Sequence, residues 1–143
     1  MRFGLVLCLL LTACSGIQLQ TGVYQTLEEA RLAGAIDHGW VPRGLPASAS
    51  DLREGHLHNG QLWGVFSFEA AHRAALEALV ATEITRGTVE CDPPGRLEWW
   101  PPILRSPIDL ERVRSTGFRL YRGRDGRLTF AVNWAQGKAY YWK

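Results

Sequence analysis

Three side chains that could bind a metal ion follow one another at alternate positions of one segment. Glu54, His56 and His58 stand at i, i+2 and i+4, and alternate side chains of a β-strand point to the same face. A carboxylate and two imidazoles could hold Zn²⁺ for a hydrolase, with His72 or Asp51 completing the site. The same pattern also fits the solvated side of a hairpin. The metal-assisted envelope hydrolase is therefore the alternative, not the main prediction.

No other catalytic set is evident in the sequence. Ser48 and Ser50 lack the G-x-S-x-G turn of a hydrolase nucleophile, and no base can be paired with them. Cys91 lies between Glu90 and Asp92, whose negative charges would raise the pKa of the thiol instead of activating it. A glycine-rich phosphate loop is also absent from the sequence. We therefore predict a protein without catalytic activity or cofactor.

Tryptophan and arginine side chains offer contact groups without chemistry. Trp99 and Trp100 stand in a proline-rich stretch, and Arg122 and Arg124 in an arginine-rich one. Exposed tryptophans are typical anchors of interfaces and of sugar-binding surfaces, and a basic face suits anionic headgroups or phosphate-bearing glycans. These four residues are the predicted binding residues. The alternative is that the aromatic side chains fill a buried sheet face and the arginines line a solvated strand.

The first residues of the sequence predict where the protein is located in the cell. Arg2 precedes an uncharged run, residues 3–11, which is typical of a secretory signal peptide and too short to span a membrane. The run ends in Leu11-Thr12-Ala13-Cys14, which resembles the lipobox of bacterial lipoproteins. That resemblance implies cleavage before Cys14, with lipid on its sulfur and on the new amino terminus. Within that resemblance, Ser15 instead of an aspartate after the cysteine implies an outer-membrane location.

This interpretation divides the chain into a signal peptide at 1–13, a lipidated amino terminus with its tether at 14–25 and one domain at 26–143. Several acyl chains on one terminus would hold the domain to the membrane almost permanently, because each buried methylene adds about 0.8 kcal/mol. We expect the domain to face the periplasm. The alternative is ordinary secretion, in which Cys14 stays free to form a disulfide with Cys91.

Composition limits the size and the partners of the protein. The chain has 143 residues, of which 46% are hydrophobic and 21% charged, and its net charge is only +2. After the leader is removed, the length fits one ordinary globular domain. The small net charge predicts no nucleic-acid partner. An envelope protein or a cell-wall glycan remains as the expected partner besides the membrane.

Local signals predict the first elements. Thr26 and Glu29 form a capping box that opens a helix over 27–38, and Gly39 would end it. Asn59-Gly60 predicts a hairpin with a two-residue turn. In that register His58 lies opposite Gln61, and the predicted core face consists of Leu57, Leu62, Phe66 and Phe68. The helix is predicted to bury Leu32, Ala33 and Ile36.

The second half of the chain predicts two further helices and three strands. A helix is expected over 69–84, and a short one from Ser106-Pro107 to Arg114. Asp125-Gly126 and Gln136-Gly137 would turn between three closing strands. The predicted fold class is α+β, in the order α-β-β-α-β-β-β, with an antiparallel sheet of about five strands and helices on one face.

Three short motifs carry a second resemblance. LPASASD, the WWP loop and the terminal YYW are similar to those of small bacterial envelope proteins of unassigned function. That resemblance supports the fold and implies no catalytic residues.

Overall fold

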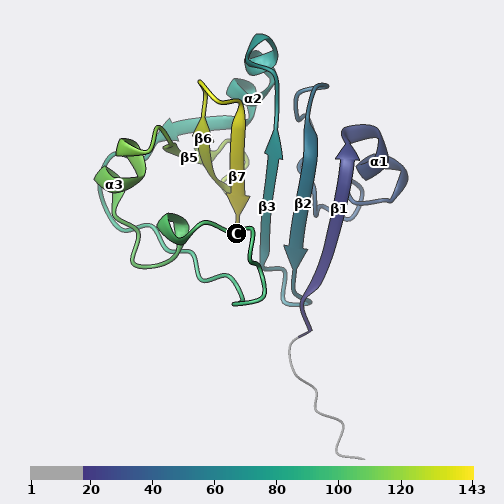
Figure 1. Cartoon of the computed structure of the whole chain (residues 1–143), viewed down its shortest axis with the longest axis horizontal. Helices are drawn as coiled ribbons and strands as arrows, with labels where there is room; N and C mark the ends of the chain where they lie inside the picture. Colours follow the sequence, from purple (N-terminus) through teal and green to yellow (C-terminus); the bar gives the residue numbers. More distant parts are fainter. Residues whose placement is uncertain (1–17) are drawn as a thin grey trace, which may run out of the picture.

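A computed structural model describes residues 18–143, which form a sheet of seven strands with short helices on both of its faces (Figure 1). The elements in chain order are β1 Gln20–Thr26, α1 Leu27–Leu32, β2 Ser50–His56, β3 Leu62–Ser67, η1 Ala70–His72, α2 Arg73–Leu79, β4 Val80–Glu83, η2 Pro102–Leu104, α3 Leu110–Ser115, β5 Arg119–Gly123, β6 Thr129–Asn133 and β7 Lys138–Trp142.

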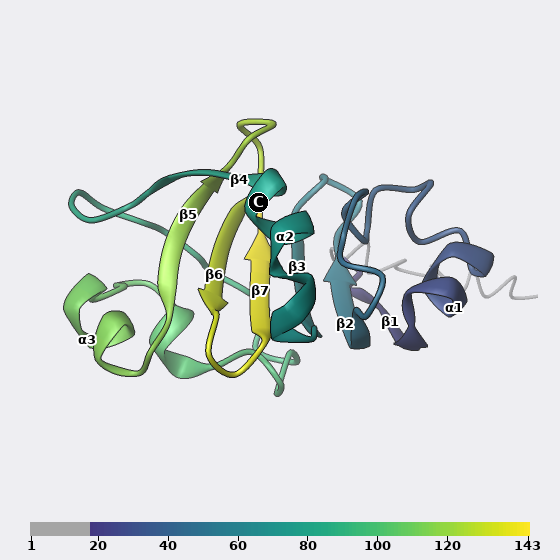
Figure 2. The same cartoon turned by 90° about the horizontal axis from the view of Figure 1, so that it is seen from above.

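The sheet is antiparallel throughout and has the order β1-β2-β3-β7-β6-β5-β4. Figure 2 shows the central strands side by side, with α3 beyond β5 and α1 beyond β1. The predicted α+β class with an antiparallel sheet is confirmed. The strand count is seven instead of about five, because β1 and β4 were not expected.

Both faces of the central strands are buried, and this is why the helices do not lie on one face as predicted. β3, β6 and β7 are buried at nearly every position, so their side chains fill two separate cores. The first face carries Leu52, Phe66 and Tyr141, and α1 and α2 pack against it. The second face carries Trp63, Leu120 and Tyr140, and the segment 84–118 with η2 and α3 covers it.

The first helix begins where predicted and ends early. The Thr26 hydroxyl accepts a hydrogen bond from the Glu29 amide, and the Glu29 carboxylate accepts one from the Gln25 amide, which confirms the capping box. The helix ends at Leu32, because Gly34 with φ 78° allows the backbone to leave the helix. Leu32 was predicted to be buried and is 72% exposed.

Two other segments depart from the predicted secondary structure. The expected helix over 69–84 becomes a strand at Val80, because residues 80–83 pair with β5 at the edge of the sheet. The predicted tether contains β1, which pairs with β2 from Gln20 onward. The third helix begins at Leu110 instead of after Ser106-Pro107, because the Asp109 carboxylate caps the amides of Glu111 and Arg112.

The predicted hairpin exists in a register shifted by one residue. His56 pairs with Leu62, and Gly60 takes a φ of 91° in a loop one residue longer than predicted. Such a shift moves side chains to the opposite face. Leu57 therefore packs against the second core, whereas Leu62 lies in the first together with Phe66 and Phe68.

Candidate functional site

The predicted metal ligands do not share a site. Glu54 and His56 lie on the first face, but β2 ends at His56 and His58 is exposed in the hairpin loop. Side chains alternate between the two faces only within a strand, so His58, which lies beyond the end of β2, is not aligned with Glu54 and His56. Among residues 18–143 no group of three or more His, Cys, Asp or Glu side chains is placed to hold a metal ion. The metal ligand set of the alternative function was therefore wrong.

Glu54 and His56 instead form a buried polar network. Glu54 is 1% exposed; its carboxylate lies 2.7 Å from His56 Nδ1 and accepts a 3.3 Å hydrogen bond from the Tyr24 hydroxyl. Burial raises the pKa of the Glu54 carboxyl, and the hydrogen bonds from His56 and Tyr24 oppose that shift. Gly22 stands opposite Glu54, where a side chain would collide with Tyr24 and Glu54.

Stacking fixes the imidazole of this network. The ring of Trp40 lies between those of His38 and His56, at centroid distances of 4.4 and 4.0 Å. The second ring nitrogen of His56, Nε2, lies 3.1 Å from Gln20 Oε1. Both imidazole nitrogens of His56 therefore have protein partners. The contacts of Glu54 and His56 hold β1, β2 and the loop at Trp40 together, and they leave no free base for a substrate.

Cys91 is not an activated nucleophile. The side chain is buried in the second core, and burial, with a smaller contribution from Asp92, raises the pKa of the thiol to about 12. The predicted direction was right, but burial and not the acidic neighbours is its main cause. Cys14, the predicted lipidation site and alternative disulfide partner, lies outside the described residues.

The two adjacent tryptophans have different surroundings. Trp100 is 2% exposed; its indole N–H donates to the Leu104 carbonyl at 2.9 Å, and its ring meets Tyr140 and Trp142 edge-on. Trp100 is thus a core residue with no surface to offer a ligand. Trp99 is only partly buried and lines a groove on the second face.

The two predicted arginines lie apart from this groove. Arg122 is exposed and donates to the Thr129 hydroxyl at 3.3 Å. The guanidinium of Arg124 donates to the carbonyls of Ala78 and Val80, which ties the β5–β6 turn to the α2–β4 junction. The structure therefore does not bring the four predicted binding residues together, and only Trp99 lines the groove on the second face.

We call that groove, which has a volume of about 470 Å³, the aromatic groove. Trp99 forms part of its wall, and a cross-strand row on the second face, Val23, Arg53, Val65 and Tyr140, forms its floor. The remaining lining residues are Tyr24, Gln25, Asp51, Ser67 and Lys138. The predicted hairpin register was wrong and β1 was not predicted, so among these residues the sequence indicated only Trp99 as a binding residue.

Polar side chains in the aromatic groove are available to a ligand. The side chains of Gln25, Asp51, Arg53 and Ser67 form no hydrogen bond or ion pair with other residues of the described chain. Asp51 adopts a φ of 48° at an irregularity of β2, a strained backbone of the kind that clusters at functional sites. The groove thus offers donors and acceptors around aromatic rings, which suits a ligand rich in hydroxyl groups.

The aromatic groove extends from the middle of the strands to the end opposite the start of β1. Gln20, the first residue of β1, shares a cross-strand row with His56 and Leu62. Ser67 and Lys138, which line the groove, belong to the row of Thr26 at the opposite end. The two rows are six residue steps apart along β1, or about 20 Å at the usual rise of about 3.4 Å per residue.

Comparison with known proteins gives one family match. Residues 20–67 match the model of the YbbD head domain. The match runs from the first residue of β1 to the last residue of β3 and covers about a third of the chain. It is compatible with an envelope-type bacterial protein and assigns no molecular function. No curated protein and no solved structure matches the chain.

One further finding concerns the membrane. Within residues 18–143, no helix has both the length and the apolar character needed to cross a bilayer.

Proposed function

We propose that the protein is an outer-membrane lipoprotein whose periplasmic domain binds a glycan of the cell envelope without catalysis. The aromatic groove is the observation that carries this proposal. Trp99 supplies partly exposed ring surface, and the largely buried Tyr140 belongs to the floor. Gln25, Asp51 and Arg53 supply unpaired polar groups beside them. Sugars present both apolar C–H faces and hydroxyl groups, so they need this combination.

The proposed function is not catalytic, because the side chains best suited to catalysis are paired with each other or protonated. Glu54 and His56 satisfy each other in a buried network, and the Cys91 thiol stays protonated at neutral pH. A protein partner is the second candidate, supported by exposed Val23 at the groove. The glycan is favoured because interface cores are depleted of charge, whereas Asp51, Arg53 and Lys138 line this groove.

The membrane anchor in this proposal is lipid on Cys14. Gln20 is only six positions after Cys14, so the start of β1 lies at most about 20 Å from the lipidated residue. The near end of the sheet then lies close to the membrane. The aromatic groove reaches the opposite end of the strands, where a cell-wall polymer is accessible.

Sedimentation with purified, insoluble peptidoglycan tests the glycan assignment. Full-length lipoprotein in neutral detergent should sediment with peptidoglycan, and Trp99→Ala should weaken binding about tenfold, which corresponds to about 1.4 kcal/mol. Leu32→Ala removes an exposed apolar side chain outside the groove and serves as the control. Equal binding by wild type and Trp99→Ala would refute the site. A crosslinked protein lost only in Trp99→Ala would instead favour the protein partner.

Metabolic labelling with a palmitate analogue tests the anchor separately. The wild type should incorporate the label, and Cys14→Ala should not. Equal labelling of the two, or none in either, contradicts lipidation. Membrane fractionation of the labelled protein then distinguishes the outer membrane from the inner one.

A further inference from the structure

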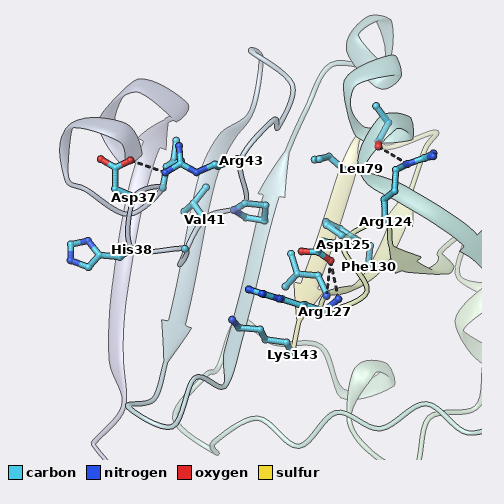
Figure 3. Close-up of a pocket in the computed structure, with 15 residues that line it drawn as sticks. Asp37, His38, Val41, Arg43, Leu79, Arg124, Asp125, Arg127, Phe130 and Lys143 are labelled. Atoms are coloured by element: carbon cyan, nitrogen blue, oxygen red, sulfur yellow. Dashed lines mark hydrogen bonds and ion pairs between the residues drawn. The ribbon is translucent and has the colours of Figure 1, made fainter.

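A second and larger groove lies on the first face of the sheet, about 600 Å³ in volume (Figure 3). We call it the basic groove. Its size lies within the range of small-molecule sites. It opens between the loop after α1 on one side and the β5–β6 turn with the end of α2 on the other. Its apolar lining consists of Ile36, Val41, Pro42, Leu79, Leu128 and Phe130.

Cationic side chains outnumber carboxylates around the basic groove. The cationic side chains are Arg43, Arg124, Arg127 and Lys143, and the acidic side chains are Asp37 and Asp125; the main-chain oxygen of Lys143 accepts from the Leu62 amide. The two carboxylates already have partners. Asp37 pairs with Arg43 at 3.0 Å, and Asp125 accepts the backbone amides of residues 127 and 128.

Two of the cations are free to bind a ligand. The Arg124 guanidinium is occupied by two backbone carbonyls, whereas the side chains of Arg127 and Lys143 form no hydrogen bond or ion pair within residues 18–143. In Figure 3 both extend in the same direction, toward the Val41 side of the groove. An anion placed between them would gain two charge-assisted contacts.

The free cations lie at the end of the sheet where the chain enters from Cys14. Lys143 exchanges backbone hydrogen bonds of 3.0 and 3.1 Å with Leu62. Leu62 pairs with His56, and His56 with Gln20. Lys143 therefore belongs to the same cross-strand row as the first residue of β1. Figure 1 shows the carboxyl terminus and the start of β1 at the same end of the sheet.

We propose that the basic groove binds the phosphate headgroup of an anionic phospholipid from the membrane that holds the protein. The phosphate lies between Arg127 and Lys143, and the glycerol and the first acyl carbons lie on the apolar lining around Val41 and Leu79. The charge and shape of the groove carry this assignment independently of glycan binding. Only the orientation toward the membrane rests on the proposed anchor.

Native mass spectrometry of the full-length lipoprotein in neutral detergent tests this site. Phosphatidylglycerol is titrated in parallel with phosphatidylcholine and with inorganic phosphate. We expect the protein to retain phosphatidylglycerol at least tenfold more tightly than either of the others. Equal retention of phosphatidylcholine would overturn the charge argument, and equal retention of inorganic phosphate would overturn the lipid assignment.

A double charge-reversal variant tests where the phospholipid binds. Arg127→Glu/Lys143→Glu should lower the affinity for phosphatidylglycerol at least tenfold. Arg86→Glu/Arg96→Glu makes the same change of charge at exposed positions outside the groove and should leave it unchanged. Equal loss in both pairs would mean a nonspecific charge effect and refute the site. Circular dichroism verifies that each variant is folded, and the labelling of Cys14 reports on the anchor separately.

Discussion

The two faces of the sheet are covered in different ways. On the first face, the short helices α1 and α2 contribute buried apolar side chains, Ala30 and Leu76 among them. On the second face, the segment 84–118 is largely irregular and contains Pro93, Pro94, Pro101 and Pro102, which have no amide hydrogen to donate. An irregular cover needs other partners for its backbone carbonyls.

Side-chain donors supply those partners. The indole N–H groups of Trp100 and Trp142 donate to the carbonyls of Leu104 and Glu90, and Arg105 donates to those of Pro93 and Leu97. Each of these two tryptophans on the second face thus both fills the core and donates a hydrogen bond to a backbone carbonyl. On the first face Tyr141 likewise donates to the Trp40 carbonyl, whereas a leucine only fills space. Truncation of such a tryptophan on the second face should therefore cost more than truncation of a leucine on the first.

Trp100→Ala should have the largest effect. Loss of a buried tryptophan costs about 3–5 kcal/mol, and the Leu104 carbonyl also loses its donor. Trp99→Ala, at the neighbouring and partly exposed position, should cost less than about 1 kcal/mol. Urea unfolding followed by far-ultraviolet circular dichroism measures both. Similar losses for the two variants would mean that the neighbouring tryptophans do not differ in role.

Leu76→Ala tests the first face. Leu76 belongs to α2 and is fully buried in the first core, so its truncation should cost about 2–5 kcal/mol from the cavity alone. The same urea titration applies. A loss near zero would show that α2 does not cover a real core. A loss above that of Trp100→Ala would reverse the expected order of the two faces.

The buried carboxyl of Glu54, on the first face, predicts that the stability of the protein depends on pH. Burial raises the folded-state pKa of Glu54 above its ordinary value near 4.5. Its contribution to stability is thus fully present below that value and is lost as pH rises through the raised folded-state pKa. Glu54→Gln removes this loss, so its stability relative to wild type should increase as pH rises from about 4 toward 7. A difference that stays constant with pH contradicts the prediction.

The smallest effect concerns Cys91 on the second face. With its pKa raised to about 12, the thiol should resist iodoacetamide in the folded protein at pH 8 and react fully in denaturant. Peptide mapping by mass spectrometry measures the modification of Cys91 itself. Modification of the folded protein at the denatured rate would mean that the second core opens readily. Trp100→Ala should accelerate the reaction, because Trp100 belongs to the same buried cluster.

Sequence by itself determined the features that depend on near neighbours in the chain. The Thr26–Glu29 capping box, the turns at Asp125-Gly126 and Gln136-Gly137 and the antiparallel pairing of the last three strands were predicted, because capping groups and left-handed glycines act over a few residues. The consecutive apolar and aromatic residues 130–132 of β6 and 139–142 of β7 also signalled burial on both faces. The prediction of helices on one face did not use that signal.

Tertiary structure decided what depends on partners far apart in the sequence. β4 is a strand because β5 lies beside it, and β1 is a strand because β2 does; neither reason is visible in a single segment. Trp99 and Trp100 are adjacent and identical, and only the packing of 84–118 on the second face made one a core residue and the other a groove residue. Arg127 and Lys143 line one groove for the same physical reason, because β6 and β7 run antiparallel and bring the β5–β6 turn to the end of β7.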